Sequence, residues 1–443
     1  NKEFHKKQNF FSFSDIDSER KDRIMKFTST EATPAPHVPP GVLRLTGAAK
    51  EDIPMYRIQT MNKISPVGLN RFPSELYEVG DAVQDPQGIL VRSAKLLDLE
   101  FNPGLLAIAR AGVGVNNIPL DRCAAAGIPV FSTPGANANA VKELVICAML
   151  MGSRDIPGAI RWVREQAASG ADVSTVVEKG KSAFIGPELY KKTLGIIGLG
   201  AIGSIVANTA ISLGMDVYGY DPFLSVDTAL RLDRHVHVVK DINDLYKRSN
   251  YITMHIHYTE KTAHMIDASA IAAMKRGVRV INLARGEIVD DEAMLTALDT
   301  GMVAAYITDF PNNRLLTAPH VIAMPHLGAS TPESEQNCAA MAVDTLRDYL
   351  ESGNIRSSVN LPEMTMDRSG VQRLCVLHKN VPGMLANITS LFGRDGVNVE
   401  NLSNKSRGDY AYTMVDLGSK VGDNVIEDVR RTANVIRVRS LEW

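Results

Sequence analysis

Residues 194–203 read LGIIGLGAIG, and this stretch decides the fold of the chain. An apolar strand runs into a Gly-x-Gly-x-x-Gly turn, and a helical stretch at residues 204–213 follows it. This order is typical of a βαβ unit that binds a dinucleotide. Gly198 makes the tight turn, Gly200 lets the backbone approach a pyrophosphate, and Gly203 lets the helix pack closely against the strand.

The acid that follows this turn predicts which dinucleotide is bound. The next strand ends at Asp221, eighteen residues after Gly203, where a carboxylate accepts hydrogen bonds from the adenosine ribose hydroxyls. Its charge repels a 2′-phosphate and no arginine adjoins it, so NAD is favoured over NADP. The first turn of the helix, at Ala201 and Ile202, presents free N–H groups to the phosphates.

The patterns around this unit predict an α/β fold. Short apolar runs at residues 88–91 and 105–109 are typical of buried parallel strands, and residues 137–152 predict a long apolar helix. Strand and helix patterns then alternate to about residue 325, which indicates βαβ units and a parallel sheet. We therefore expect a Rossmann-type, doubly wound nucleotide domain and a second α/β domain.

The two ends of the chain differ from this central part. Residues 1–54 hold five of the 21 prolines, a density that prevents helices and central strands, so we expect an N-terminal extension. Its acidic residues argue against an organellar transit peptide. Residues 372–443 predict a compact α+β unit with the order strand, helix, strand, strand, helix, strand, and residues 354–371 predict the linker that precedes it.

The composition excludes several classes of function. Hydrophobic residues make up 45% of the 443 residues and the net charge is −2, which argues against a nucleic-acid or anionic-membrane partner. No run approaches the roughly 18 apolar residues of a membrane helix, and the first residues lack the apolar core of a secretory signal. The four cysteines show no metal-ligand spacing, so they predict reduced thiols in a cytoplasmic protein and no metal site.

Four further motifs accompany the glycine-rich turn. They are RAGVGVNN at residues 110–117, TPGAN at residues 133–137, NLARG at residues 282–286 and PHLGA at residues 325–329. With these motifs in this order, the chain resembles the D-isomer-specific 2-hydroxyacid dehydrogenases, in particular the members that act on 3-phospho-D-glycerate and carry a C-terminal ACT domain.

The resemblance covers about residues 55–443 and implies a division into domains. The implied domains are a substrate-binding domain at residues 55–149, to which residues 327–355 return, an NAD-binding domain at residues 150–326, and an ACT regulatory domain at residues 372–443.

The resemblance also implies that Arg285 and His326 are catalytic. Oxidation of a 2-hydroxy acid removes a hydride from carbon and a proton from the hydroxyl group. A neutral His326 can take that proton because imidazole titrates near neutral pH. Arg285 offers a planar guanidinium that binds the substrate carboxylate and polarises the developing carbonyl. Both residues follow apolar runs that read as strands, at the sheet edge where such folds bind ligands.

The chain departs from the family at one catalytic position. Family members hold the histidine with a glutamate that lies between the arginine and the histidine in the sequence. Here residues 310–325 contain no Asp or Glu, and Asn313 stands about where that glutamate falls. We hypothesise that His326 works without the usual carboxylate or borrows another one, such as Asp309.

Binding residues follow from the same resemblance. Besides the glycine-rich turn and Asp221, those at the cofactor are His255, Ala284, Asp309 and Gly328. Those at the substrate are Arg92, Ser93, Arg110, Gly112, Val113 and Gly114, with Arg154 donated across a dimer. Paired cations such as Arg92 and Arg110 suit a phosphate, while the alternative for each arginine is a solvated surface position.

Two motifs carry the resemblance in the ACT unit, HKNVPGML at residues 378–385 and GVNV at residues 396–399. They imply that His378, Asn380 and Asn398 bind an amino acid, with L-serine as the expected effector, because these side chains suit a carboxylate and an ammonium group. The alternative is a dimerisation module that binds no ligand.

The implied function is the NAD-dependent oxidation of 3-phospho-D-glycerate to 3-phosphooxypyruvate, the first step of L-serine biosynthesis, by a homodimer or homotetramer. Two alternatives remain open. One is a dehydrogenase or reductase of another 2-hydroxyacid, such as glycerate, glyoxylate or hydroxypyruvate. The other is a non-catalytic protein that senses NAD, which the retention of both Arg285 and His326 disfavours.

Overall fold

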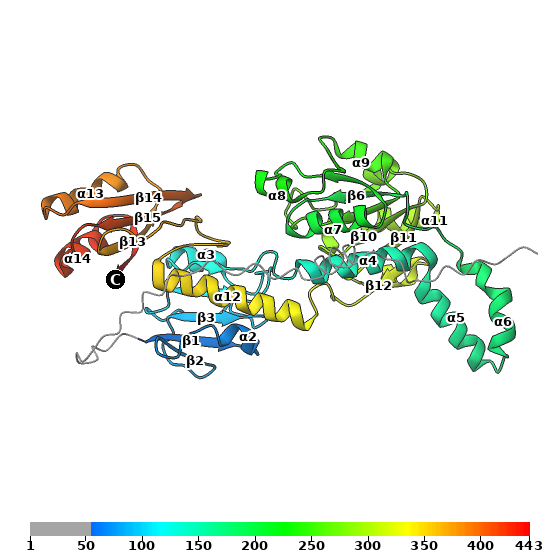
Figure 1. The fold of residues 1–443 in the computed structure, drawn as a ribbon, viewed down its shortest axis with the longest axis horizontal. Coiled ribbons are helices and arrows are strands. Elements are labelled where there is room, and N and C mark those ends of the chain that lie inside the picture. The colour runs from blue at the N-terminus through cyan, green and yellow to red at the C-terminus, as the bar shows by residue number, and fades with distance from the viewer. Residues whose placement is uncertain (1–54) are drawn as a thin grey trace, which may run out of the picture. The chain divides into compact units, whose positions relative to one another are not determined.

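The computed structural model describes residues 55–443, which form three sheets (Figure 1). The extension expected at residues 1–54 lies outside the described residues. The expected α/β fold with a C-terminal α+β unit is confirmed. Within residues 55–443, every helix is too short or too polar to cross a lipid bilayer.

The first sheet has five parallel strands in the order β2-β1-β3-β4-β5. Its elements are β1 (Tyr56–Met61), α2 (Pro66–Leu69), β2 (Tyr77–Gly80), β3 (Gly88–Val91), β4 (Ala107–Arg110), α3 (Leu120–Ala125) and β5 (Val130–Phe131). Helix α12 (Pro332–Ser352) returns from later in the chain, and its Ala342 and Leu346 share one hydrophobic core with Leu90 and Phe131 of the sheet. We call these elements the five-stranded domain.

The second sheet has seven parallel strands in the order β12-β11-β10-β9-β6-β7-β8. The strands are β6 (Thr193–Ile197), β7 (Asp216–Tyr220), β8 (Val236–Val239), β9 (Tyr251–Met254), β10 (Val278–Asn282), β11 (Val303–Thr308) and β12 (Val321–Ala323). The helices that follow the strands are α7 (Ala201–Ser212), α8 (Val226–Arg231), α9 (Ile242–Arg248), α10 (Ala268–Ala272) and α11 (Asp291–Asp299), with short 3₁₀ turns η2 (Gly286–Ile288) and η3 (Leu315–Thr317).

Helices cover both faces of this seven-stranded domain. Successive residues of a strand point to opposite faces of a sheet. Ile196 of β6 packs in a core with Val206 of α7, whereas its neighbour Ile197 packs in a second core with Leu245 of α9 and Met294 of α11. The two cores confirm the doubly wound arrangement expected from the sequence.

Helix α4 (Ala138–Arg154) matches the long helix expected at residues 137–152, but it belongs to the seven-stranded domain. Val145 and Met149 lie in the same core as Ile196. The boundary expected at residue 150 therefore falls inside this helix, and the seven-stranded domain begins at about residue 138.

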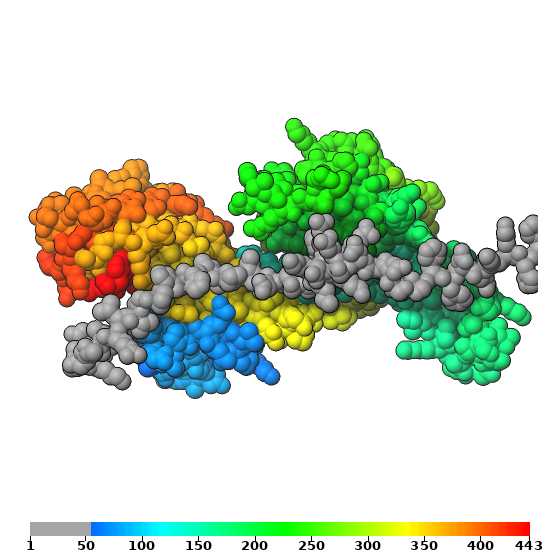
Figure 2. Space-filling view, in the orientation of Figure 1, coloured from blue at the N-terminus to red at the C-terminus, as the bar shows by residue number. Residues whose placement is uncertain are grey.

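A helical hairpin that the sequence analysis did not anticipate follows α4. It consists of α5 (Ile156–Ala168), α6 (Val173–Gly180) and the 3₁₀ turn η1 (Lys181–Phe184). Neither α5 nor α6 has a fully buried residue, and Ile160 and Val163 are 50% and 36% exposed. Figure 2 shows the atoms of the hairpin projecting from the seven-stranded domain. Among residues 55–443, the apolar side chains of α5 such as Ile160 thus have little cover.

The C-terminal domain is a four-stranded antiparallel sheet in the order β14-β15-β13-β16. Its elements are β13 (Gln372–Lys379), α13 (Met384–Arg394), β14 (Val399–Arg407), β15 (Tyr410–Leu417), α14 (Asp423–Arg431) and β16 (Val435–Glu442), in the order that the sequence predicts. Ile388 of α13 and Val429 of α14 pack on one face of the sheet. The other face carries Cys375 and Tyr412 into the core of the five-stranded domain.

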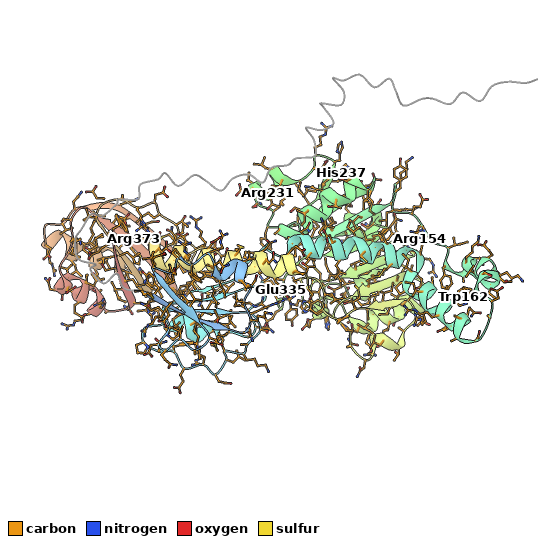
Figure 3. The ribbon with its side chains drawn as sticks, turned by 60° about the horizontal axis from the view of Figure 1, so that its bottom comes forward. Arg154, Trp162, Arg231, His237, Glu335 and Arg373 are labelled. Atoms are coloured by element: carbon orange, nitrogen blue, oxygen red, sulfur yellow. The ribbon has the colours of Figure 1, made fainter. Side chains whose placement is uncertain are left out.

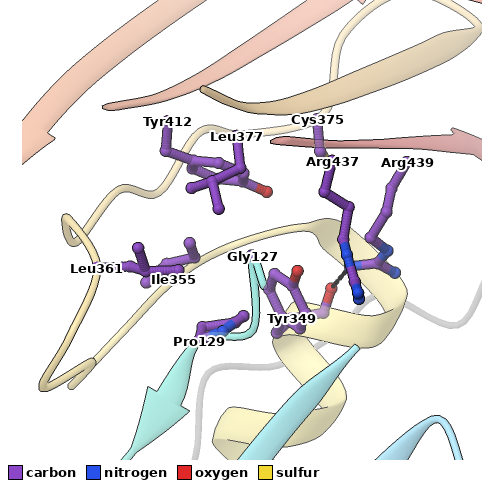
Figure 4. Close-up of a pocket in the computed structure, with 10 residues that line it drawn as sticks. All are labelled: Gly127, Pro129, Tyr349, Ile355, Leu361, Cys375, Leu377, Tyr412, Arg437 and Arg439. Carbon is purple, nitrogen blue, oxygen red and sulfur yellow. Dashed lines mark hydrogen bonds between the residues drawn. The ribbon is translucent and has the colours of Figure 1, made fainter. Parts of the chain in front are cut away.

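Arginines of β16 attach this domain to the five-stranded domain. Arg439 donates hydrogen bonds to the carbonyl oxygens of Tyr349 at 3.0 Å and Leu350 at 2.8 Å, and Arg437 donates to that of Leu105. Figure 4 shows both arginines and Tyr349 at a small cavity between the two domains. The last carbonyls of a helix have no partner within it. The two bonds from Arg439 add to those that the Gly353 N–H and the Tyr56 hydroxyl donate to the same oxygens at the end of α12.

Candidate active site

The glycine-rich turn has the geometry that its sequence predicts. Gly198 has a φ of 90°, and a Cβ there would lie 2.6 Å from the carbonyl oxygen of His255. A Cβ on Gly203 would collide with the carbonyl oxygen of Gly198, so only glycine lets α7 approach β6. A Cβ on Gly200 would meet no heavy atom within 4 Å, which leaves this side of the turn open to a ligand.

Asp221, directly after β7, is held beside the turn by backbone hydrogen bonds. Its Oδ2 accepts from the N–H of Leu199 at 2.9 Å, and its Oδ1 accepts from the N–H of Phe223 at 2.8 Å. Each carboxylate oxygen has two lone pairs, so each retains capacity for a further donor. The carboxylate is therefore fixed in place and keeps capacity to accept hydrogen bonds from the hydroxyl groups of a ligand.

His255 follows β9 and closes the other side of the turn. Its N–H donates to the carbonyl oxygen of Ile197 at 2.7 Å, and its Nε2 lies 3.2 Å from the hydroxyl oxygen of Thr253. Burial lowers the pKa of His255 to about 4, so the ring is neutral at neutral pH.

A buried asparagine shapes the loop that carries Arg285. Asn282, the last residue of β10, donates from Nδ2 to the carbonyl oxygen of Arg285 at 2.8 Å and accepts from the N–H of Ala284 at 3.1 Å. A Cβ on Gly114 would lie 3.1 Å from Nη2 of Arg285, so the guanidinium reaches the loop after β4 of the five-stranded domain. The sequence analysis quoted Asn282 in a motif without giving it a role.

Phe310 lies between the two predicted catalytic side chains. The guanidinium carbon of Arg285 is 5.7 Å from the centroid of its ring, and the ring of His326 is 4.7 Å from it, centroid to centroid. The His326 ring is exposed. Among the described residues, no carboxylate forms a hydrogen bond with either of its nitrogens. An aromatic ring thus contacts both residues, and the sequence analysis missed it.

Asp309 is close to His326 without a hydrogen bond to it. Its Oδ2 accepts from the N–H of Gly328 at 3.1 Å, and its Oδ1 is buried without a partner among residues 55–443. Burial raises the pKa of Asp309, while the Gly328 N–H and the charge of His326 act in the opposite direction. The geometry is that of a carboxyl group with one oxygen available to a ligand donor.

Three arginines converge where β3, β4 and β10 end. Arg110 donates from Nε to the carbonyl oxygen of Arg92 at 3.1 Å. Burial, and then the charges of Arg285 and Arg92, lower the pKa of Arg110. Arg92 forms an ion pair of 2.7 Å with Glu335 of α12, a residue that the sequence analysis missed. Convergent guanidinium groups of this kind are suited to an anion with more than one charge.

The other predicted substrate residues lie around this cluster, with one exception. Gly112, with a φ of 149°, lies two residues after Arg110 in the loop, and Val113 and Gly114 continue that loop toward Arg285. The N–H of Ser93 donates to Oδ1 of Asn62 at 3.0 Å. Arg154 is exposed at the end of α4, and Figure 3 shows it far from Glu335. Within this chain the structure does not bring Arg154 to the cluster.

Comparison with known proteins identifies the family. The D-isomer specific 2-hydroxyacid dehydrogenase, NAD binding domain, matches residues 146–328. The D-3-phosphoglycerate dehydrogenase of Haemophilus influenzae is 31% identical over 379 residues, which cover 82% of this chain and 88% of that protein. The chain belongs to the D-isomer specific 2-hydroxyacid dehydrogenase family. This finding confirms the family that the motifs indicated.

Two further similarities define how far the likeness extends. The D-3-phosphoglycerate dehydrogenase of Synechocystis is 36% identical over 326 residues, 72% of this chain, which spans only 56% of that protein's length. The structure of the NAD⁺-bound 3-phosphoglycerate dehydrogenase of Entamoeba histolytica is 26% identical with a TM-score of 0.54, over 69% of this chain and 99% of that one. The match to the family's NAD binding domain and the likeness to this NAD⁺-bound structure support NAD as the cofactor of the chain.

The predicted effector residues are already hydrogen-bonded within the C-terminal domain. The ring of buried His378 lies 2.8 Å from the carbonyl oxygen of Lys379 and 2.9 Å from the hydroxyl of Thr413. Asn380 donates to the carbonyl oxygen of Gly408 at 3.1 Å, and Asn398 donates to Glu400, also at 3.1 Å. A ligand of this domain must therefore replace these hydrogen bonds with its own, or bind to the donor and acceptor positions that they leave free.

Proposed function

We propose that this family member catalyses the NAD-dependent oxidation of 3-phospho-D-glycerate to 3-phosphooxypyruvate, the first step of L-serine biosynthesis. The observation that carries the proposal is the convergence of Arg92, Arg110 and Arg285 at one set of strand ends. A substrate with a carboxylate and a phosphate presents two anionic groups, and three guanidinium groups can bind both.

The described residues fit NAD. The turn at residues 198–203 supports the pyrophosphate, Asp221 the ribose, and the unpartnered Oδ1 of Asp309 an amide N–H. When bound, NAD accepts a hydride from the substrate carbon. The protein supplies the binding and the orientation for this step.

Arg285 and His326 supply the remaining chemistry. Arg285 binds the substrate carboxylate and stabilises negative charge on the oxygen that becomes a carbonyl. His326 takes the hydroxyl proton on a ring nitrogen, and its exposed ring gives access both to substrate and to solvent, where the proton is released. Phe310 limits the orientations of both side chains by contact with them.

An assay of NADH formation tests this function. We expect turnover with 3-phospho-D-glycerate, and we expect H326Q to bind NAD while it turns over at least about 100-fold more slowly. Turnover of D-glycerate alone would support an unphosphorylated substrate instead. One observation favours that second candidate, since Glu335 already offsets the charge of Arg92. NAD binding without turnover of any hydroxyacid would support the sensor.

We further propose that the protein acts as a homodimer or homotetramer in the cytoplasm. The exposed apolar side chains of α5, such as Ile160, support burial against a second copy, and Arg154 directly precedes this hairpin. All four cysteines are unpaired, as in a reducing compartment. Light scattering of the purified protein and of the I160D variant tests the assembly. If I160D has the same mass as the unmodified protein, this face of α5 is excluded as the subunit interface.

L-serine is the proposed effector of the C-terminal domain. The side chains of His378, Asn380 and Asn398 can bind a carboxylate and an ammonium group once their internal hydrogen bonds exchange. Titration of L-serine against turnover tests this role, and the absence of inhibition at saturating serine would leave the domain as a structural module.

A further inference from the structure

The first turn of α12 places a carboxylate on a predicted phosphate ligand. Glu335 Oε1 lies 2.7 Å from Nη2 of Arg92, and the two side chains are 45% and 38% exposed. An ion pair this exposed contributes little to stability, because water solvates both groups almost as well. Another anion can therefore replace Glu335 on Arg92. Because the pair lies at the arginine cluster, we interpret it as functional rather than structural.

The loops around Glu335 are held together by a residue that the sequence analysis did not single out. Asn62, with a φ of 77°, accepts the N–H groups of Ser93 at 3.0 Å and Ala94 at 2.6 Å on its Oδ1. These bonds connect the loop after β1 to the loop that carries Arg92. Lys63 follows Asn62 in the first loop, so it is held beside the loop that carries Arg92. The hydrogen bond from Arg92, and in smaller measure the charge of Lys63, lower the pKa of Glu335, so its carboxylate is ionised at neutral pH.

The net charge of the side chains at these strand ends is opposite and equal to that of one class of substrate. The side chains at these strand ends include four cations, Arg92, Arg110, Arg285 and Lys63, and one carboxylate, Glu335. A phosphate ester has a charge of about −2 at neutral pH. The carboxylate and phosphate of 3-phospho-D-glycerate together match the net charge of these five side chains. An unphosphorylated hydroxyacid offers only its carboxylate and leaves Glu335 on Arg92.

We propose that Glu335 is a specificity-determining residue whose carboxylate competes with the phosphate of the substrate for Arg92. The inference rests on the function proposed above and goes beyond it, because it assigns a limit on the affinity for the phosphate, and so on the selectivity for the phosphorylated substrate, to an internal competitor. Only a doubly charged group displaces Glu335 from Arg92 readily. The competition lowers the affinity for the phosphorylated substrate and for the phosphorylated product alike. The opposite role, in which Glu335 orients Arg92 for the phosphate, makes the opposite prediction.

The variant E335Q separates these roles, and E333Q is the matched control, because Glu333 is exposed in the same turn of α12. In the full chain with NAD, we expect E335Q to raise the ratio of kcat/KM for 3-phospho-D-glycerate to that for D-glycerate about tenfold, which is 1.4 kcal/mol. We expect E333Q to leave the ratio at the wild-type value. High salt should reduce the effect because it screens exposed charges.

Calorimetric titration with inorganic phosphate provides a readout that does not depend on turnover. We expect E335Q to bind phosphate several-fold more tightly than wild type and E333Q. Unchanged or weaker phosphate binding by E335Q would overturn the inference, even if 3-phospho-D-glycerate is a substrate. Absence of turnover by wild type with tighter phosphate binding by E335Q would instead reject the proposed function and leave the competition in place.

Discussion

Replacing Asp416 by asparagine tests how much one buried ion pair, between β13 and β15, stabilises the C-terminal domain. The side chains of Arg373 and Asp416 are both 0% exposed, with Nε to Oδ1 at 2.6 Å and Nη2 to Oδ2 at 2.7 Å. D416N keeps the shape of the side chain and removes its charge. The guanidinium of Arg373 then stays buried without a counter-charge.

The expected cost follows from what D416N leaves intact. Arg373 also donates to the carbonyl oxygens of Ser352, Met366 and Asp367, and these bonds remain in the variant. The loss therefore comes from the charge pair and from the hydrogen bonds that Oδ2 of Asp416 accepts from the N–H and hydroxyl of Ser369. Breaking a buried pair by removing one partner costs about 3–5 kcal/mol. The matched control is E427Q on α14, because Glu427 forms exposed pairs in the same domain that are worth about 0–1 kcal/mol.

Urea unfolding followed by the fluorescence of Trp443 measures this difference. The Arg373 guanidinium carbon lies 5.4 Å from the Trp443 ring, and the chain has two tryptophans, so W162F makes Trp443 the sole reporter. We expect D416N to move the midpoint well below that of E427Q at an unchanged slope. Equal midpoints for D416N and E427Q would refute the reasoning, since they would mean that the buried charge is compensated without Asp416.

Three further predictions concern the site. D309N should weaken NAD binding and leave the acidic limb of the pH–rate profile in place, because no hydrogen bond joins Asp309 to His326; a displaced limb would show that His326 borrows this carboxylate. His255 has a pKa of about 4 in the folded chain against 6.5 for the free group, so the unfolded chain binds more protons in this range and stability falls as the pH drops through it. H255Q should flatten that loss between pH values of about 6.5 and 4 in urea midpoints, and an equally steep loss would argue against a buried neutral ring. D221S should raise the ratio of kcat/KM for NADP to that for NAD by about tenfold, because the 2′-phosphate no longer meets a carboxylate; a constant ratio would exclude a ribose contact.

The features predicted from the sequence are those encoded by neighbouring residues. The glycine-rich turn was predictable because strand, turn and helix are contiguous, and a Cβ at Gly198 or Gly203 fails for local steric reasons. The order of elements in the C-terminal domain followed from apolar periodicity in the same way. The domain to which α4 belongs could not be predicted from the sequence, because its apolar face can pack on either parallel sheet. Only the tertiary structure decides between the two sheets.

The features that were missed depend on pairs that are distant in the sequence. Arg92 and Glu335 meet only because α12 returns to the first sheet, and an acid in the first turn of a helix is ordinary in sequence because it also suits the helix dipole. Phe310 gave no signal because an aromatic residue after a buried strand is usually part of a core. The family motif predicts a glutamate near His326 and gives no indication of the Phe310 ring, which contacts both Arg285 and His326.

Helix α12 connects the two parts of the molecule whose roles the sequence assigned separately. It has 21 residues, which span about 31 Å at 1.5 Å per residue. Its first turn carries Glu335 to Arg92, and its last carbonyls accept hydrogen bonds from Arg373 and Arg439 of the C-terminal sheet. A helix with a packed apolar face moves as one body, so a displacement of that sheet reaches Glu335 through the helix without any change in the strands between them. The C-terminal domain is thus attached to the element that bears Glu335, and this attachment would connect the proposed effector with the proposed substrate arginines.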